Sequence, residues 1–269
     1  MKKSIGFIGS GNMGSAIIGG IISSHLVSPS DITAADISPS ALESLREKFG
    51  IHTSSDNLHV AAHSDILFLS VKPNIYPVVI KEIKESIREN TIIVAIAAGQ
   101  SIEKIEALFE RDIKLAKVMP NTPALVGAGM AAISPNKFLD EEELTDVLEI
   151  FKSLGKAEVV PEHLMDVVTG ISGSSPAYVY MFIEAMADAA VAEGMPRALA
   201  YEFSAQAVLG SAKMVLDTNQ HPGALKDMVC SPGGTTIAAV CELERKGMRD
   251  AVISAVKVCT EKSREMGRS

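Results

Sequence analysis

The sequence predicts an α/β protein with an N-terminal doubly wound, Rossmann-type parallel sheet and a second, all-helical C-terminal dimerisation domain. Two observations predict this class. Short apolar runs alternate with helical patterns up to about Val160, and from Leu164 onward strand signals stop and only helical segments follow. Alternating strands and helices, with strands that are apolar throughout, are typical of a parallel sheet covered on both faces. We place the domains at residues 1–161 and 162–269.

The strands of the first domain are predicted from its short apolar runs. These runs are SIGFIG (4–9), DITAAD (31–36), DILFLSV (65–71), TIIVAIA (91–97), KLAKVMP (114–120) and GAGMAAIS (127–134). We expect the last of them to be an edge strand. Residues 12–24 and 38–50 read as helices, and Ser38 followed by Pro39 is a typical helix start.

The C-terminal half reads as helices broken at SGSSP (172–176), EGMP (193–196), NQHPG (219–223) and SPGG (231–234). The segment 176–193 is apolar on nearly every face. Such a helix has to be buried, and in a small helical domain a second subunit is the natural cover. We therefore expect an obligate homodimer.

Composition excludes several classes of partner. The net charge is −8 and no run of Lys and Arg forms a basic stripe, which argues against nucleic acid and anionic membrane surfaces. The most apolar later stretch, 176–192, contains Glu184 and Asp188, which argues against a membrane span. The N-terminus lacks the long apolar stretch of a signal peptide. We expect a cytoplasmic protein.

The metal-binding residue types do not form a site. Cys230, Cys241 and Cys259 are odd in number and lack CxxC spacing, so buried free thiols in a reducing compartment are expected. His59 and His63 are one helical turn apart, but the Glu of a zinc-binding HExxH is missing and the sequence places no third ligand. A solvated helix face explains this pair.

A dinucleotide-binding motif follows the first strand. Gly9, Gly11 and Gly14 form G-x-G-x-x-G between a strand and a helix within a βαβ unit, which is the context the motif requires. The first glycine makes the tight turn, the second lets the backbone approach a pyrophosphate, and the third lets helix and strand pack closely. The alternative is a glycine-rich turn without a ligand.

Asp36, at the end of the second strand, is the acidic residue expected after this motif. Its carboxylate can accept a hydrogen bond from a ribose 2′-hydroxyl and would repel a 2′-phosphate. No Arg follows it closely, so the local chemistry favours NADH over NADPH. The alternative is that Asp36 only caps the following helix, and the sequence leaves both interpretations open.

Two loops at the carboxyl edge of the predicted sheet carry polar residues. Lys72 lies in VKPN, and its backbone is expected to border the nicotinamide ribose. Its side chain is either a catalytic acid or a solvated or structural lysine. Asn121 and Thr122 lie in MPNTP, where they either hydrogen-bond cofactor or substrate or serve as ordinary turn residues.

The stretch VCSPGGTTIA (229–238) interrupts the helical domain with a turn. Gly233 and Gly234 allow positive φ and leave backbone N–H groups free at the start of the next helix, which predicts an anion pocket without a lysine. The hydroxyls of Ser231 and Thr235 can add donors. The alternative is a helix N-cap with flexible glycines and no ligand.

The chain resembles the pyrroline-5-carboxylate reductases nearly end to end. The resemblance is carried by GFIGSGNMGSA, SDILFLSVKP, AIAAGQSI, VMPNTPALVGAGM, TGISGSSPAYVY and QHPGALKDMVCSPGGTTIAAV. The last block matches the family signature. It implies an NADPH- or NADH-dependent enzyme that makes L-proline, built as a homodimer, with larger rings of dimers in some members.

The resemblance, together with the glycine motif and the loops at the sheet edge, gives a set of candidate site residues. The cofactor-binding candidates are Ile8, Gly9, Ser10, Gly11, Asn12, Met13, Asp36, Asn57, Val71, Lys72, Pro73, Ala97, Ala98, Gly99 and Asn121. The substrate-binding candidates are Ser174, Ser231, Gly233, Gly234, Thr235 and Thr236. The substrate is expected between the nicotinamide and the loop 231–236.

The substrate implied by the resemblance is a small ring with a C=N bond and a carboxylate. The cofactor carries the difficult step, so the protein has to hold the carboxylate and place a hydrogen-bonding group at the ring nitrogen. Thr236 is our candidate catalytic residue for that nitrogen. Its hydroxyl is too weak an acid to act alone, so we assign it orientation first.

Three positions depart from the family pattern. Ser175 stands where members usually have Gly, Asp36 stands where members often have Ser or a residue beside an Arg, and Asn219 stands where some have Glu. The second departure leaves the choice between NADPH and NADH open. The third weakens any role carried over to Asn219.

Two other functions are compatible with parts of the sequence. A β-hydroxyacid dehydrogenase shares the domain plan but needs a lysine about two turns into the helix after GISGSSPAY, where this chain has none. A catalytically silent dinucleotide-binding regulator is favoured only by Ser175 and Asn219.

Overall fold

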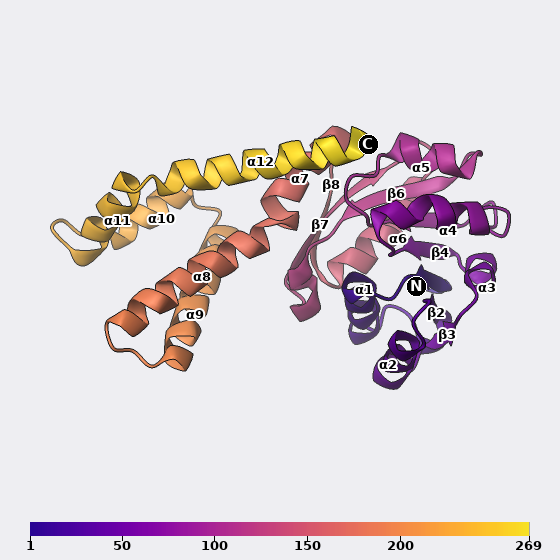
Figure 1. The fold of residues 1–269 in the computed structure, drawn as a ribbon, viewed down its shortest axis with the longest axis horizontal. Helices are drawn as coiled ribbons and strands as arrows, with labels where there is room; N and C mark the ends of the chain where they lie inside the picture. Colours follow the sequence, from indigo (N-terminus) through magenta and orange to yellow (C-terminus); the bar gives the residue numbers. More distant parts are fainter. Residues whose placement is uncertain (269) are drawn as a thin grey trace. The chain divides into compact units, whose positions relative to one another are not determined.

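The computed structural model describes residues 1–268, and the chain forms two compact units (Figure 1). The first comprises Met1–Ser174 and Val258–Ser269, and the second comprises Ser175–Lys257. The C-terminal helix α12 (Met248–Arg268) therefore begins in the second unit and ends in the first.

The first unit is built on one sheet whose strand order is β3-β2-β1-β4-β5-β6-β7-β8. The strands are β1 (Ile5–Ile8), β2 (Ile32–Ala35), β3 (His52–Ser54), β4 (Ile66–Leu69), β5 (Ile92–Ala95), β6 (Lys114–Met119), β7 (Gly129–Pro135) and β8 (Gly155–Val159). The chain runs outward from β1 to β3 and then returns to place β4 on the other side of β1. This reversal is the topological switch point of a doubly wound sheet.

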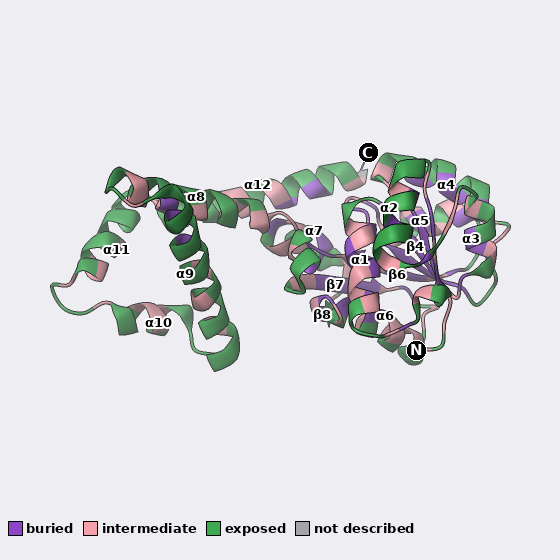
Figure 2. Ribbon diagram, turned by 90° about the horizontal axis from the view of Figure 1, so that it is seen from below, coloured by how far each residue is buried: buried purple, intermediate pink, exposed green. Residues whose placement is uncertain are grey.

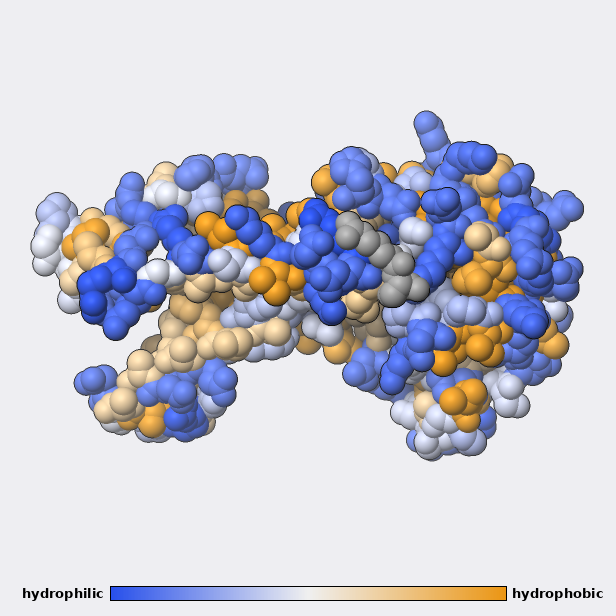
Figure 3. Space-filling view, turned by 45° about the horizontal axis from the view of Figure 1, so that its top comes forward, coloured by the Kyte–Doolittle hydropathy of each residue, from blue (hydrophilic) through white to orange (hydrophobic). Residues whose placement is uncertain are grey.

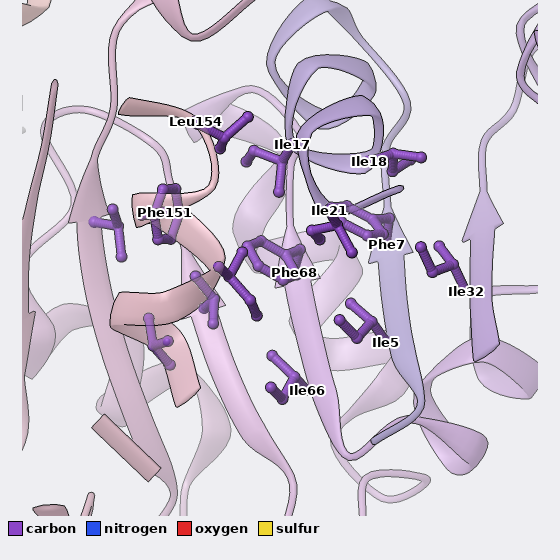
Figure 4. Close-up of a cluster of buried hydrophobic side chains, with 14 of the residues drawn as sticks. Ile5, Phe7, Ile17, Ile18, Ile21, Ile32, Ile66, Phe68, Phe151 and Leu154 are labelled. Carbon is purple, nitrogen blue, oxygen red and sulfur yellow. The ribbon is translucent and has the colours of Figure 1, made fainter. Parts of the chain in front are cut away.

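Apolar strands and amphipathic helices form two cores, one on each face of the sheet. The helices of the first unit are α1 (Asn12–Ser23), α2 (Pro39–Phe49), α3 (Asn57–His63), α4 (Tyr76–Ile83), α5 (Ile102–Phe109), α6 (Glu141–Lys152) and α7 (Met165–Val168), followed by a π-helical turn (Thr169–Gly173). Helices α1, α2 and α6 cover one face, where Ile17 and Ile21 pack on Phe7 and Phe68 (Figure 4). Helices α3, α4 and α5 cover the other. The predicted doubly wound class is confirmed.

The predicted start of α2 is also confirmed. The helix begins at Pro39, and the Ser38 hydroxyl accepts a hydrogen bond from the N–H of Ala41 at 3.3 Å. This satisfies one of the backbone donors that a helix N-terminus leaves unpaired.

The sheet differs from the prediction beyond β6. Strand β7 was expected at an edge, but it lies between β6 and β8. It runs antiparallel to β6 because the link between them contains no crossover helix, whereas α6 crosses over to make β8 parallel to β7. The sequence prediction did not find β3 and β8 because β3 is a three-residue polar strand and β8 alternates polar and apolar residues.

The second unit is helical, as predicted. It contains α8 (Ser175–Ala192), α9 (Arg197–Thr218), α10 (Pro222–Val229), α11 (Thr235–Arg245) and the start of α12. Its helices are mostly exposed, in contrast to the buried strands of the first unit (Figure 2). Apolar side chains therefore face outward along them (Figure 3). In α8 only Ala187 is buried, while Tyr180 is 59% and Met181 69% exposed.

The expected burial of the three thiols is wrong for the single chain. Cys241 is exposed, and Cys230 and Cys259 are partly exposed. All three lie on or next to helices whose surfaces are largely exposed in the single chain. Among residues 1–268, no helix has the length and apolarity needed to cross a membrane.

Candidate functional site

The carboxyl ends of β1 and β4 meet at the switch point, which is where ligands bind in this architecture. The glycine loop leaves β1 there with Gly9 at φ +92°. A side chain on Gly9 would place its Cβ 2.8 Å from the backbone oxygen of Ser70, the residue after β4. Only glycine allows the loop to turn this close to the neighbouring strand.

The next part of the loop is open. A Cβ on Gly11 would have no other atom within 4 Å. Gly11 is the N-cap of α1, no side chain caps this helix, and its first turn has no acidic residue. Free N-terminal amides beside empty space are suited to the pyrophosphate of a dinucleotide. The residues therefore fit the cofactor that the motif implies.

Asp36 is held firmly beside this loop. Its Oδ2 accepts hydrogen bonds from the backbone N–H and the hydroxyl of Ser10, both at 2.7 Å, and its Oδ1 accepts one from the N–H of Ser38 at 2.9 Å. Burial opposes the charged form, but these hydrogen bonds outweigh it and lower the pKa of Asp36. The carboxylate is thus fully ionised at neutral pH. A carboxylate oxygen has two acceptor sites, so Oδ1 can accept a further hydrogen bond.

A cavity of about 420 Å³ opens between the glycine loop and the loop after β4. It brings together predicted residues from four parts of the chain: Ile8, Gly9, Gly11, Asp36, Asn57, Val71 and Lys72. Asn57, the first residue of α3, donates to Glu82 Oε2 at 2.9 Å. Lys72 is the only cation among the described residues that line this cavity.

The cavity also contains residues that the sequence prediction missed. These are Ala35, Ile37, Ser70, Ile75 and Val79. Ile37 is 99% exposed and directly follows Asp36. The Ser70 hydroxyl is buried and has no hydrogen-bond partner in the described chain. Of these residues, Ile37 could have been found from the sequence, because it directly follows the acidic residue of the dinucleotide motif.

The remaining predicted cofactor residues lie outside this cavity. Ala97, Ala98 and Gly99 form the loop after β5 and line a small cavity with Lys117 and Asp166. Asn121 is buried, its Nδ2 donates to Ser172 O at 3.1 Å, and its Oδ1 accepts from Met130 N at 2.8 Å. Both ends of the Asn121 amide are therefore used in joining its loop to β7 and to the π-helical turn.

The second unit contains the turn Ser231–Gly234. Gly233 has φ +69°, and Gly234 N donates to Ser231 O at 3.0 Å, as in a type II turn with Pro232 at its second position. Both glycines allow positive φ, but only Gly233 adopts it, since Gly234 has φ −80°. A Cβ on Gly234 would lie 2.4 Å from Ser231 Oγ, which a side-chain rotation can move, and 3.1 Å from the backbone oxygen of Ser231, which is a tight contact.

Helix α11 starts directly after this turn. Gly234 is its N-cap, no side chain caps it, and its first turn has no acidic residue. Thr235 is exposed and Thr236 is half-buried. The N–H of Gly234 is therefore used within the turn, and it is the uncapped amides in the first turn of α11, beside the hydroxyls of Ser231 and Thr235, that can bind one carboxylate. Ser174, the other predicted substrate residue, belongs to the first unit, where its hydroxyl lies 3.2 Å from Cys259 Sγ.

Comparisons with known proteins give two family models for parts of the chain and relatives that match it over its full length. Residues 162–266 match the family model described as pyrroline-5-carboxylate reductase dimerisation, and residues 4–99 match the one described as NADP oxidoreductase, coenzyme F420-dependent. The pyrroline-5-carboxylate reductase of Escherichia coli (strain K12) is 54% identical over 269 residues, which cover 100% of both chains.

Solved structures of pyrroline-5-carboxylate reductases also match the whole chain. A pyrroline-5-carboxylate reductase from Coxiella burnetii aligns with a TM-score of 0.93 at 31% identity over 100% of both chains. The Plasmodium falciparum pyrroline carboxylate reductase with NADP bound aligns with a TM-score of 0.90 at 34% identity, over 99% of this chain and 98% of that one.

Proposed function

The chain belongs to the pyrroline-5-carboxylate reductase family, and from this premise we propose that it reduces the C=N bond of Δ1-pyrroline-5-carboxylate to L-proline, the last step of proline biosynthesis. It is an NAD(P)H-dependent oxidoreductase. The observation that carries the proposal is the 54% sequence identity with the Escherichia coli enzyme over the full length of both chains.

The cofactor is assigned to the cavity at the switch point and to the loops beside it. The open space at Gly11 and the uncapped start of α1 support binding of the pyrophosphate by backbone amides. Asp36 supports binding of the ribose, and Val71–Pro73 and Ala97–Gly99 border the same sheet edge. When bound, NADH or NADPH supplies the hydride for the ring carbon of the C=N bond.

We assign a preference for NADH. Asp36 is ionised, and the hydrogen bonds from Ser10 and Ser38 fix its carboxylate in place. A fixed negative charge repels a 2′-phosphate and accepts a hydrogen bond from a 2′-hydroxyl. Lys72 lines the same cavity, and its positive charge favours NADPH because it attracts the 2′-phosphate. NADPH is therefore accepted less well rather than excluded.

The substrate carboxylate is assigned to the turn Ser231–Gly234 and the first amides of α11. The support is the pairing of a positive-φ glycine with an uncapped helix start and exposed hydroxyls. Thr236 is assigned to the ring nitrogen, where its hydroxyl orients the ring by a hydrogen bond. The nitrogen has to be protonated for the adjacent carbon to accept hydride, and Thr236 does not supply that proton by itself.

The apolar surface of the second unit supports a homodimer. Exposed apolar residues there include Tyr180, Met181, Phe203, Leu209, Leu216, Met228, Val229 and Ile253. Large exposed apolar surfaces mark interaction sites, and the matching family model is described as a dimerisation domain. Larger rings of dimers and a cytoplasmic location complete the proposal.

The test is a direct assay. Purified chain is mixed with pyrroline-5-carboxylate and either reduced cofactor, and the near-ultraviolet absorbance of the reduced nicotinamide is followed. Loss of absorbance that depends on the substrate is expected, faster with NADH at low cofactor concentration. A flat trace with both cofactors would instead support a non-catalytic regulator.

A further inference from the structure

The loop after β5, Ile96–Gln100, has no regular structure of its own. It leaves the sheet next to the loop after β4, and its Gly99 has φ +70°. The proposed function places the cofactor against Ala97–Gly99. Apart from a turn at Ala98 and Gly99, the loop has no hydrogen-bonded structure of its own. Such a loop contacts a ligand reproducibly only if other elements fix its position.

The first element that fixes this loop is Tyr76, the first residue of α4. Its side chain is fully buried, and its hydroxyl donates to Leu69 O at 2.8 Å and accepts from Ala97 N at 3.3 Å. Burial raises the pKa of this phenol, which therefore stays protonated and able to donate. The hydroxyl joins the end of β4 to the start of the loop after β5.

Tyr76 also connects the two cofactor loops through the chain itself. It follows directly on Pro73–Ile75, a 3₁₀ turn at the end of the Val71–Pro73 loop. One rigid aromatic side chain thus sets the spacing between the loop after β4 and the loop after β5. Nothing in the sequence distinguished this tyrosine from the apolar residues around it.

The second element is the C-terminal end of α12, which lies against the same loop (Figure 1). A Cβ on Gly99 would lie 3.1 Å from Met266 Cβ and 3.6 Å from Gly267 N. One turn earlier, the buried Ser263 hydroxyl donates to Asp166 Oδ1 at 2.6 Å. Cys259, Ser263 and Gly267 are spaced by four residues, so they lie on one helix face. That face packs on the loop at Gly99, on Asp166 of α7 and on Ser174.

We infer that Tyr76 and the last turns of α12 are positioning elements for the cofactor loop Ala97–Gly99, acting from two sides without touching the cofactor. The inference rests on the proposed role of this loop. It implies that the C-terminal turns of the chain contribute to cofactor affinity although they lie far in sequence from every cofactor-binding motif.

Tyr76→Phe tests the first element because it removes only the hydroxyl. The dissociation constants for NADH and NADPH are measured by calorimetry without substrate, alongside urea unfolding. We expect both constants to rise by about threefold to tenfold, the effect of one or two hydrogen bonds, with kcat at saturating cofactor close to that of the parent. A lower stability with unchanged dissociation constants would show a purely structural role and overturn the inference. Tyr201→Phe, which alters a partly exposed tyrosine of the second unit, is the matched control.

Ser263→Ala tests the second element, with Lys262→Ala on the exposed side of the same turn as control. We expect Ser263→Ala alone to weaken cofactor binding, by about threefold. The double variant Tyr76→Phe/Ser263→Ala then completes a double-mutant cycle. Both residues act on one loop, so non-additive effects on cofactor binding are expected. Additive effects would mean that the two residues do not share a target.

These results are separable from a failure of the proposed function. If the parent chain bound cofactor but reduced no pyrroline-5-carboxylate, the reaction would be wrong and the variants would still test the loop. If the parent bound neither cofactor, the assignment of Ala97–Gly99 as a cofactor loop would fall, and the inference with it.

Discussion

The carboxylate of Asp36 accepts two hydrogen bonds from Ser10, one from the backbone N–H and one from the hydroxyl, each 2.7 Å long. Ser10 lies inside the glycine loop, and Asp36 lies at the end of β2. The pair therefore joins the part of the site assigned to the pyrophosphate to the part assigned to the ribose. In the proposed cofactor site it also places a fixed negative charge beside the ribose, where it would repel a 2′-phosphate.

Replacing Asp36 by Ser is expected to shift cofactor preference toward NADPH. The substitution removes the charge that repels the 2′-phosphate and leaves Lys72 as the remaining charged group of the cavity. The ratio of kcat/KM for NADH to that for NADPH should fall by about tenfold, equivalent to about 1.4 kcal/mol. Steady-state kinetics with both cofactors measure this. Asp31→Ser, at an exposed aspartate before β2, should leave the ratio unchanged, and an unchanged ratio in Asp36→Ser would remove Asp36 from cofactor selection.

Replacing Thr236 by Ala is expected to lower turnover more than cofactor affinity. The hydroxyl is assigned to the ring nitrogen of the substrate, so its loss should reduce kcat by about tenfold to a hundredfold, the range for a hydrogen bond to a charged group. Thr236→Ser keeps the hydroxyl and should restore most of the rate. Equal losses of turnover and cofactor affinity in Thr236→Ala would contradict the assignment.

Replacing Gly234 by Ala is expected to weaken substrate binding specifically. The added Cβ would lie 2.4 Å from Ser231 Oγ and 3.1 Å from Ser231 O, so the hydroxyl has to rotate and the turn has to shift by a few tenths of an ångström at the proposed carboxylate site. KM for pyrroline-5-carboxylate should rise by about tenfold, while the dissociation constant for NADH stays as it was. Gly210→Ala in α9 is the control, because its Cβ would meet no atom within 4 Å. A parallel rise in the NADH constant would point to general disruption.

Folding stability is expected to fall on acidification. Asp65 accepts hydrogen bonds from Ser4 N at 2.8 Å, from Ser4 Oγ at 2.9 Å and from Arg88 at 2.9 Å. Burial opposes its ionisation, but these bonds outweigh burial and hold the pKa of Asp65 below its ordinary value of 3.8. The stabilisation is present above that ordinary value and is lost as the pH falls through the lowered pKa of the folded state. The free energy of unfolding is measured with urea at several pH values below about pH 4. It should depend less steeply on pH in Asp65→Asn than in the parent.

Charge on α8 is expected to prevent dimer formation. Tyr180 and Met181 are 59% and 69% exposed in the single chain, and a partner subunit is proposed to cover them. The double variant Tyr180→Asp/Met181→Asp should sediment as a monomer and lose activity with either cofactor. Val78→Asp introduces a charge at an exposed apolar residue of α4 in the first unit and should remain dimeric. A dimeric α8 variant would place the interface elsewhere.

Much of the fold followed from local pattern. The apolar runs predicted β1, β2, β4 and β5 because a strand buried on both faces is mostly apolar. They also predicted β6, although Lys114 and Lys117 interrupt its apolar residues. Ser38 and Pro39 predicted the start of α2 because cap chemistry is local. The position of β7 did not follow, since the choice between edge and interior depends on where β8 pairs, and β8 is too polar to be found by hydrophobicity.

The candidate site divides in the same way. The glycine loop, Asp36 and the turn Ser231–Gly234 are marked by residue types whose backbone or charge requirements are visible in a short window. Ser70 and Tyr76 carry no such mark. Their significance comes from what they lie beside: an unpaired buried hydroxyl next to Gly9 in one case, and two hydrogen bonds that join separate strands in the other.

The sequence by itself determined the class of fold, the place of the dinucleotide motif and the existence of an uncovered helical domain, because each depends on periodicity or on residues that are neighbours in the chain. The tertiary structure alone decided that Asp36 is held by Ser10 and that the end of α12 packs on the loop at Gly99. Each of these depends on a distance between residues whose separation along the chain does not predict it. A linear pattern can indicate which residues are unusual, but only the folded backbone shows what they touch.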